Sequence, residues 1–235
     1  MKFGSLIQGA VFAVSSVFLT AANAAIMTKG AVTDLGGEYV ISNLGGRGSD
    51  LSLDAFSVES MLGMASGELS TFRGTAYEGS FISGSYAINA GDTFSFDWDW
   101  DADSELAYAL RLADPYSSPF MDFAFLQLEV DGTLVDGGVK ELAYALSAYD
   151  ANPSDPFAAY AGTYSWVADR SGVLNFGVGV MDVASGPLSL YGFMGDSLLT
   201  VSNIDVSALP VPEPGMLALV LVGFAGLGYS RRRQA

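Results

Sequence analysis

Phe94-Ser95-Phe96-Asp97-Trp98-Asp99-Trp100-Asp101-Ala102-Asp103 is the stretch that decides the fold, because aromatic and polar residues alternate strictly along it. Successive side chains of a β-strand point to opposite faces. The alternation therefore predicts a strand whose one face carries four large aromatic rings toward a core. Its opposite face carries a row of carboxylates that points to solvent.

Seven further segments resemble this strand, because they are short, rich in β-branched or aromatic residues and bounded by Gly, Asp, Asn or Pro. With 93–100, the predicted strands are 38–42, 51–54, 80–88, 123–130, 163–168, 173–180 and 198–206. Gly91-Asp92 and Asp131-Gly132 are turn dipeptides at hairpin positions. We expect a mainly β protein, folded as a single antiparallel β-sandwich.

One or two short accessory helices are predicted beside the strands. The first is 57–64, with Ser57 as its N-cap, and the second is 139–148, where apolar residues recur at helical spacing. Both are too short to form a layer of their own, so we expect them to lie at the margins of the sandwich.

The N-terminus has the pattern of a secretory signal peptide. A basic start at Met1-Lys2 precedes an uncharged apolar stretch, and Ala22-Asn23-Ala24 is a small-x-small cleavage pattern. We expect residues 1–24 to form a signal helix that signal peptidase removes between Ala24 and Ala25. The alternative is an uncleaved N-terminal anchor.

The C-terminus combines three features in a fixed order: Pro212-Glu213-Pro214, an apolar run over 216–229, and Arg231-Arg232-Arg233. Prolines favour an extended, accessible segment. The apolar run is 14 residues long, shorter than the roughly 20 that cross a bilayer. Snorkelling arginines extend its reach, so we expect a short transmembrane helix. A C-terminal core helix is the alternative.

This order of proline turn, apolar run and arginine cluster resembles the PEP-CTERM sorting signal of Gram-negative, exopolysaccharide-producing bacteria. The resemblance implies that residues 211–235 are a sorting tail, that an inner-membrane exosortase recognises it, and that the tail holds the precursor in the inner membrane until processing. It also implies that the mature protein reaches the cell surface, the outer membrane or an extracellular matrix such as a biofilm.

Between these ends, residues 25–210 have the length of one domain with a full core. This segment carries 25 acidic and 6 basic residues, a net charge near −19, which repels phosphate backbones and excludes nucleic acid as a partner. The chain has no Cys and no His. Nucleophilic triads built on those residues and ordinary zinc sites are therefore excluded.

A calcium ion is the one cofactor that the sequence suggests. Asp101, Asp103 and Glu105 leave the strand alternation together, and their oxygens could surround a hard cation. A solvated acidic sheet face is the alternative interpretation.

Part of the body also resembles exported bacterial surface proteins of the choice-of-anchor type. The resembling segments are 91–98, 122–126 and 177–183. This resemblance implies a jelly-roll-like sandwich and an acidic pair, Glu105 and Asp122, that holds a metal. Ser202-Asn203-Ile204 stands where Asp-Asn-Val is common in the relatives, a departure from their pattern.

The first functional hypothesis is a non-enzymatic cell-surface or matrix protein that associates with exopolysaccharide. Carbohydrate would stack on exposed aromatic rings. The candidates are Tyr160, Tyr164 and Trp166, with Tyr149 and Tyr191 as further ones. Trp166 could instead belong to the core. The alternatives are a glycoside hydrolase or lyase that uses two carboxylates, and a matrix protein that assembles through an exposed edge strand.

Overall fold

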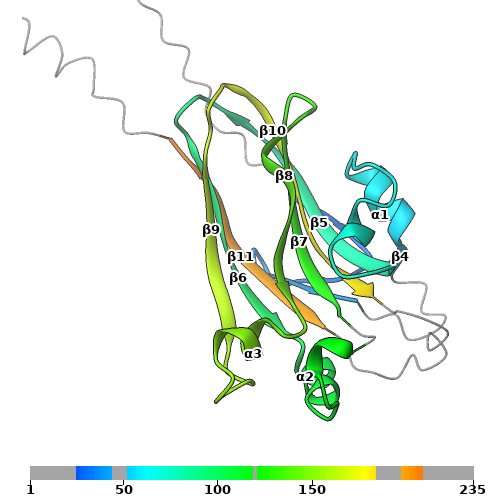
Figure 1. The fold of residues 1–235 in the computed structure, drawn as a ribbon. Coiled ribbons are helices and arrows are strands. Elements are labelled where there is room, and N and C mark those ends of the chain that lie inside the picture. The colour runs from blue at the N-terminus through cyan, green and yellow to red at the C-terminus, as the bar shows by residue number, and fades with distance from the viewer. Residues whose placement is uncertain (1–24, 44–51, 119–120, 184–196, 209–235) are drawn as a thin grey trace, which may run out of the picture.

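The computed structural model describes residues 25–43, 52–118, 121–183 and 197–208 (Figure 1). The aromatic alternation builds the middle of one of two sheets, which we call the second sheet. β6 (Thr93–Asp101) pairs with β11 (Leu198–Ser207) on one side and with β9 (Tyr160–Val167) on the other. β3 (Tyr39–Ser42) and β2 (Ala31–Asp34) complete this second sheet, in the order β2-β3-β11-β6-β9. Every pairing within it is antiparallel.

The first sheet faces it and is built around the longest strands of the chain. Its strands are β1 (Met27–Lys29), β4 (Leu53–Asp54), β5 (Ala76–Ile88), β7 (Phe123–Val130), β8 (Thr133–Tyr144) and β10 (Gly172–Val183). The order is β1-β5-β10-β7-β8, and β4 also pairs with β5. The described chain is therefore a mainly β, sandwich-like protein of two antiparallel sheets, as the sequence predicts.

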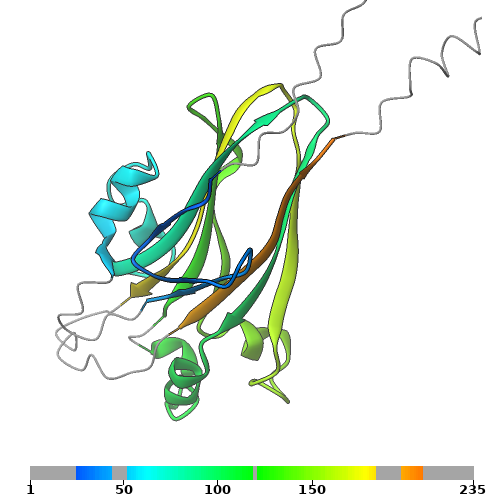
Figure 2. The ribbon, with the colours of Figure 1, turned by 180° about the vertical axis from the view of Figure 1, so that it is seen from behind.

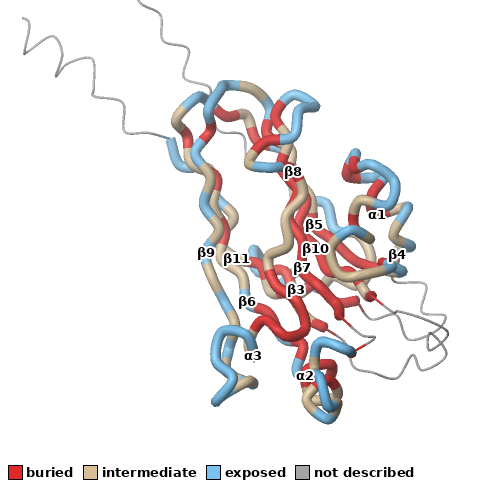
Figure 3. The backbone as a smooth tube through the Cα atoms, viewed as in Figure 1, coloured by how far each residue is buried: buried red, intermediate tan, exposed pale blue. Residues whose placement is uncertain are grey.

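The core between the sheets is aromatic and aliphatic. Phe94, Phe96 and Trp100 are buried and Trp98 is half-buried, which confirms the predicted apolar face of β6. Phe94 meets Phe176 of β10 with ring centroids 5.1 Å apart. Figure 3 shows the buried backbone along the central strands of the first sheet and the exposed backbone at the turns. Burial of these rings is the main stabilising term of the fold.

A second, smaller core lies on the outer face of the first sheet. There α1 (Ala55–Met61) and the 3-10 turn η1 (Leu69–Thr71) cover Phe81 and Phe125 (Figure 2). The sequence predicts this helix, but not its cap. The N-cap is Asp54, whose carboxylate accepts from the backbone N–H of Ser57 at 2.8 Å.

The predicted helix over 139–148 is wrong. Residues up to Tyr144 belong to β8 and pair with β7, and the short helix α3 (Ser147–Ala151) begins only after them. Helix formers such as Leu, Ala, Lys and Glu produce the helical pattern, but pairing with a buried central strand outweighs that weak preference. Asp131-Gly132 does form the predicted hairpin, between β7 and β8.

Gly91-Asp92 is not a hairpin turn, because it joins β5 of the first sheet to β6 of the second. The strands β1 and β2, the helix α2 (Asp103–Ala109) and the 3-10 turn η2 (Pro115–Ser117) are also not predicted from the sequence. The predicted helices at 1–24 and 216–229 lie outside the described residues. Within the described part of the chain, no helix is long and apolar enough to cross a bilayer.

Candidate functional site

Three carboxylates from separate elements meet at the α2 end of the sandwich, and we call them the carboxylate centre: Glu105, Asp122 and Asp182. Glu105 lies on α2, Asp122 directly precedes β7, and Asp182 lies near the end of β10. The backbone N–H of Asp122 donates to Glu105 Oε2 at 3.2 Å. The backbone N–H of Val183 donates to Asp122 Oδ1 at 3.0 Å.

An amide side chain completes the contacts of Asp122. Asn43, directly after β3, donates from Nδ2 to Asp122 Oδ2. The Oδ1 of Asn43 accepts from the backbone N–H of Ser197 at 2.8 Å, just before β11 begins. Through Asn43 and Asp122, hydrogen bonds thus join the ends of strands from both sheets.

Burial dominates the electrostatics of the carboxylate centre. Glu105 is 2% exposed and Asp122 is fully buried. Burial, reinforced by the nearby charge of Asp182, raises the pKa of Glu105 to about 8. Burial and then the charges of Glu105 and Asp182 raise the pKa of Asp122 well above its ordinary value, and burial also raises the pKa of Asp182. Among the described residues, no Lys or Arg forms an ion pair with any of the three.

Two of the four predicted calcium ligands, Glu105 and Asp122, are brought together here, and the other two are not. Asp101 and Asp103 are exposed and contact each other instead, since the backbone N–H of Asp103 donates to Asp101 Oδ1 at 3.1 Å. Within the described ranges, no group of three or more acidic residues is arranged to hold a metal ion. The residues therefore do not form a ready ligand shell.

Sequence reasoning missed Asp182 and Asn43 as members of this region. An acidic residue at the end of the otherwise apolar run 176–183 was the available sign, because such strands bury both faces. Asn43 gave no comparable sign, since a lone amide after a strand is typical of any turn.

The acidic row of β6 is a separate feature. Asp97 is on the outer face of the second sheet, where it accepts from Thr163 Oγ1 at 2.5 Å and from Asn203 Nδ2 at 2.8 Å. These two hydrogen bonds lower the pKa of Asp97. The row is thus a solvated face, in which Asp97 bonds to neighbouring polar side chains.

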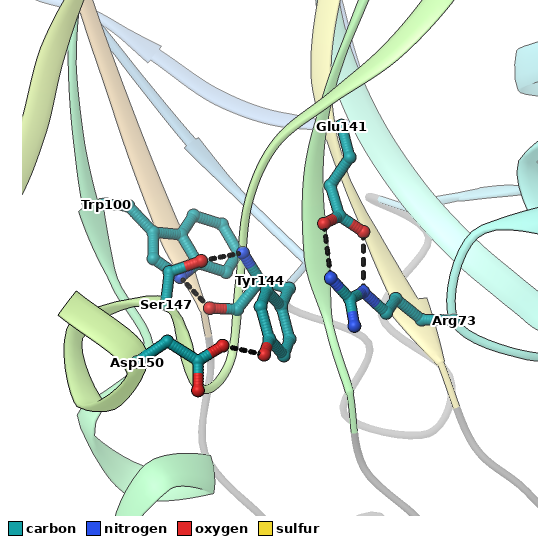
Figure 4. Close-up of polar contacts among 6 residues, drawn as sticks. All are labelled: Arg73, Trp100, Glu141, Tyr144, Ser147 and Asp150. Atoms are coloured by element: carbon teal, nitrogen blue, oxygen red, sulfur yellow. Dashed lines mark hydrogen bonds and ion pairs between the residues drawn. The ribbon is translucent and has the colours of Figure 1, made fainter. Parts of the chain in front are cut away.

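Along β8, by contrast, two half-buried carboxylates meet cations. Arg73 binds Glu141 through two hydrogen bonds of 2.5 and 2.6 Å, and its guanidinium lies 3.4 Å from the centre of the Tyr144 ring (Figure 4). Tyr144 donates its hydroxyl to Asp150 of α3. Trp100 Nε1 donates to the carbonyl of Tyr144 at 3.1 Å, which ties this edge to the core.

The second pair of this edge is Lys140 and Asp136, an ion pair within β8. Tyr164 of β9 donates its hydroxyl to the same Asp136 carboxylate. Burial alone would raise the pKa of Asp136, but the bonds from Lys140 and Tyr164 hold it below its ordinary value. Burial and the contact with Asp136 raise the pKa of Tyr164.

The three predicted carbohydrate-stacking residues all lie on the half-buried, inward face of β9. Tyr160 packs on Trp98 with centroids 5.5 Å apart, and Tyr164 packs on Phe96 at 5.3 Å. Trp166 is different, because it lines an open pocket of about 430 Å³ together with Asp136, Asp169 and Arg170. Of the further candidates, Tyr149 packs edge-on against Tyr116, and Tyr191 lies outside the described residues.

The sorting residues Pro212, Glu213, Pro214 and Arg231 to Arg233 also lie outside the described residues, as do Ala22 and Ala24 of the cleavage pattern. For the tail, comparison with known families is decisive. No curated protein sequence matches the chain. Residues 210–234, however, match the PEP-CTERM protein-sorting motif. The chain therefore carries an exosortase sorting signal at its C-terminus and is made as an exported, membrane-passing precursor.

Proposed function

We propose that this exosortase-sorted protein is a non-enzymatic cell-surface or matrix component that binds extracellular polysaccharide. The observation that supports the proposal is the Trp166 pocket. An indole ring there stands beside two carboxylates and a guanidinium in an open depression of the size that small ligands occupy. A flat ring stacks on the apolar face of a sugar while charged groups take its hydroxyls. The sorting signal marks the protein for export, which is the condition for a role outside the cytoplasm.

The burial of the acidic pair supports a binding role over hydrolysis. Glycoside hydrolases need two carboxylates that reach the scissile bond from both sides. Glu105 and Asp122 are paired, but both are buried and their oxygens accept hydrogen bonds from within the protein, so they do not present two free carboxylates to a polymer. Asp122 also accepts from Asn43 and Val183 within the protein, which ties it into the fold. The carboxylate centre accordingly has a structural role in this proposal.

The test is retention of the secreted, processed protein on immobilised bacterial exopolysaccharides and on a glycan array. Trp166→Ala should reduce retention at least tenfold. Val167→Ala is the matched control, because Val167 is the exposed neighbour on the opposite face of β9. Retention that Trp166→Ala leaves unchanged would remove this pocket from the proposal. Absence of retention on every polysaccharide would favour a purely structural protein.

Calcium binding stays a prediction, now centred on Glu105 and Asp122. A hard cation would neutralise carboxylates that no described Lys or Arg reaches. The thermal midpoint of the wild-type protein should then rise when calcium replaces chelator at pH 8, and Asp122→Asn should reduce that rise. Identical midpoints with calcium and with chelator would show that the centre holds protons alone.

A further inference from the structure

The outer face of the first sheet changes from apolar to polar along its strands. Under α1 it is apolar, with Phe81 and Phe125 buried. Two residues further along β5 and β7 it becomes polar. Ser83 of β5 and Gln127 of β7 lie opposite Gly177 of β10 in one cross-strand row. Leu62, just after α1, lies on Gly177, where a Cβ atom would come within 2.6 Å of Leu62 Cδ2. Leu62 therefore lies at the border between the apolar and the polar part of this face.

A pocket of about 520 Å³ opens at this border. Its apolar side includes Met27, Met61 and Leu62. Its polar side consists of five residues from three neighbouring strands: Ser83, Ser85, Gln127, Glu129 and Asn175. Small-molecule binding sites have volumes in this range and likewise combine an apolar wall with a few converging polar groups.

The polar side is pre-organised by its own hydrogen bonds. Ser85 Oγ donates to Asn175 Oδ1 at 2.5 Å, and Asn175 Nδ2 donates to Glu129 Oε1 at 2.7 Å. The three residues are direct cross-strand partners, so the sheet itself fixes their spacing. The second oxygen of Glu129, Oε2, remains as an acceptor at the pocket.

Gln127 is the group that points to a ligand. It is 2% exposed, and its Nε2 has no hydrogen-bond partner among the described residues. A buried donor without an acceptor is destabilising, because it has lost its hydrogen bonds to water. The side chain lines the pocket, and an amide presents either its donor or its acceptor after half a turn about its last bond. An acceptor that enters the pocket would therefore recover a hydrogen bond that the fold leaves unmade.

We propose that this pocket binds a neutral sugar. A sugar hydroxyl both accepts and donates, so neighbouring hydroxyls can accept from Gln127 and donate to Glu129 while the C–H face lies on the methionines and Leu62. No basic residue of the described chain lines the pocket, so an acidic sugar would meet Glu129 without compensation from those residues. The site is separate from the Trp166 pocket, which lies at the β8 and β9 edges and shares no lining residue with it.

The experiment is titration calorimetry of the secreted protein with glucose, galactose and mannose, and with glucuronate as the charged counterpart. At least one neutral sugar should bind, and glucuronate should bind at least tenfold more weakly. Gln127→Leu keeps the approximate shape, removes the amide and should weaken binding at least tenfold. Glu129→Gln should reduce the preference for the neutral sugar over glucuronate, which loss of folding would not do.

Trp166→Ala is the control, and it should leave this titration unchanged while it reduces polysaccharide retention. The proposals for the two pockets can therefore be contradicted independently of each other. Wild-type affinity in both Gln127→Leu and Glu129→Gln would overturn the assignment of the site. Failure of every neutral sugar to bind the wild-type protein would overturn the assignment of the ligand class.

Discussion

The carboxylate centre and the β8 edge both withdraw carboxylates from water, but they give those carboxylates different partners. Along β8, Glu141 meets Arg73 and Asp136 meets Lys140, so each acid lies beside a cation. At the α2 end, Glu105 and Asp122 are more deeply buried and are held by hydrogen bonds from an amide and from backbone N–H groups. Burial with a cation lowers a carboxyl pKa, and burial without one raises it.

The comparison indicates that burial and the charge of the neighbouring group, more than the number of hydrogen bonds, set the direction of the pKa shift of these acids. Asp122 accepts from Asn43 and Val183, and Asp136 accepts from Lys140 and Tyr164. Only the second carboxylate has a pKa below its ordinary value. The stability contributed by the two regions should accordingly depend on pH in opposite directions, and only the exposed pair of the β8 edge should respond to salt.

The largest effect is expected from Asp122→Ala. The change leaves the Asn43 amide and the Val183 N–H buried without an acceptor, which should lower the free energy of unfolding by about 4 kcal/mol. Asp122→Asn keeps an acceptor for Val183 and should lose less than half of that. Urea denaturation at pH 5 measures both. Equal losses in the two variants would mean that the carbonyl-type acceptor is unimportant.

The second expected effect is a pH dependence of opposite sign in the two regions. The pKa of Glu105 rises to about 8 on folding. Its contribution to the free energy of unfolding is therefore fully present below the unfolded pKa and is lost as the pH rises toward 8. We expect the free energy of unfolding to fall by up to about 3 kcal/mol between pH 5 and pH 8. Glu105→Gln should flatten this slope.

The pKa of Asp136 is lowered on folding, so its contribution is present at neutral pH and is lost as the pH falls through the folded pKa. Asp136→Asn should therefore flatten the acid side of the same stability curve and leave the slope between pH 5 and pH 8 as it is. A curve that Glu105→Gln changes on the acid side, or Asp136→Asn on the alkaline side, would contradict the division between the regions.

A smaller loss is expected from Arg73→Ala. The variant removes the bidentate bond to Glu141 and the contact with the Tyr144 ring, and should cost about 1.5 kcal/mol in the free energy of unfolding. Arg73→Lys keeps the charge without the planar fork and should recover only part of it. Complete recovery in the lysine variant would show that charge alone matters at this edge.

The smallest effect should come from Lys140→Gln, at about 0.5 kcal/mol, because the side chains of this pair are about one-third exposed. Sodium chloride should diminish the difference between this variant and wild type, since it screens an exposed pair. The same salt series should leave the loss in Asp122→Ala nearly constant. A strong salt dependence of the Asp122 variant would indicate that water reaches the carboxylate centre.

Local patterns in the sequence predict local structure well here. The alternation over 94–101 places each aromatic ring of β6 on the correct face. It does so because neighbours along one strand determine the pattern. Residues 139–144 also have a helical pattern, but they form a strand because β7 is available to pair with them. That partner is distant information that the segment itself does not contain.

The sites, too, depend on contacts between distant segments, which local sequence patterns do not contain. Glu105 and Asp122 could be paired from the resemblance of the body, yet Asp182 and Asn43 join them only because four chain segments end at the same place. The polar side of the Gln127 pocket is likewise assembled across β5, β10 and β7. Asn175 and Glu129, taken singly, look like ordinary solvated residues of a sheet face.

The direction of β11 has a consequence for the processing reaction. Leu198 lies opposite Asp101 at the α2 end, and Ser207 lies opposite Thr93 at the far end. Pro212 follows Ser207 by five positions, a reach of at most about 18 Å. A folded domain this close to its cleavage sequence limits how far a protease can enclose that sequence. The last described residues before the sorting signal therefore lie at the Thr93 end of the sandwich, the end opposite the carboxylate centre, and this is the side on which we expect the exosortase to act.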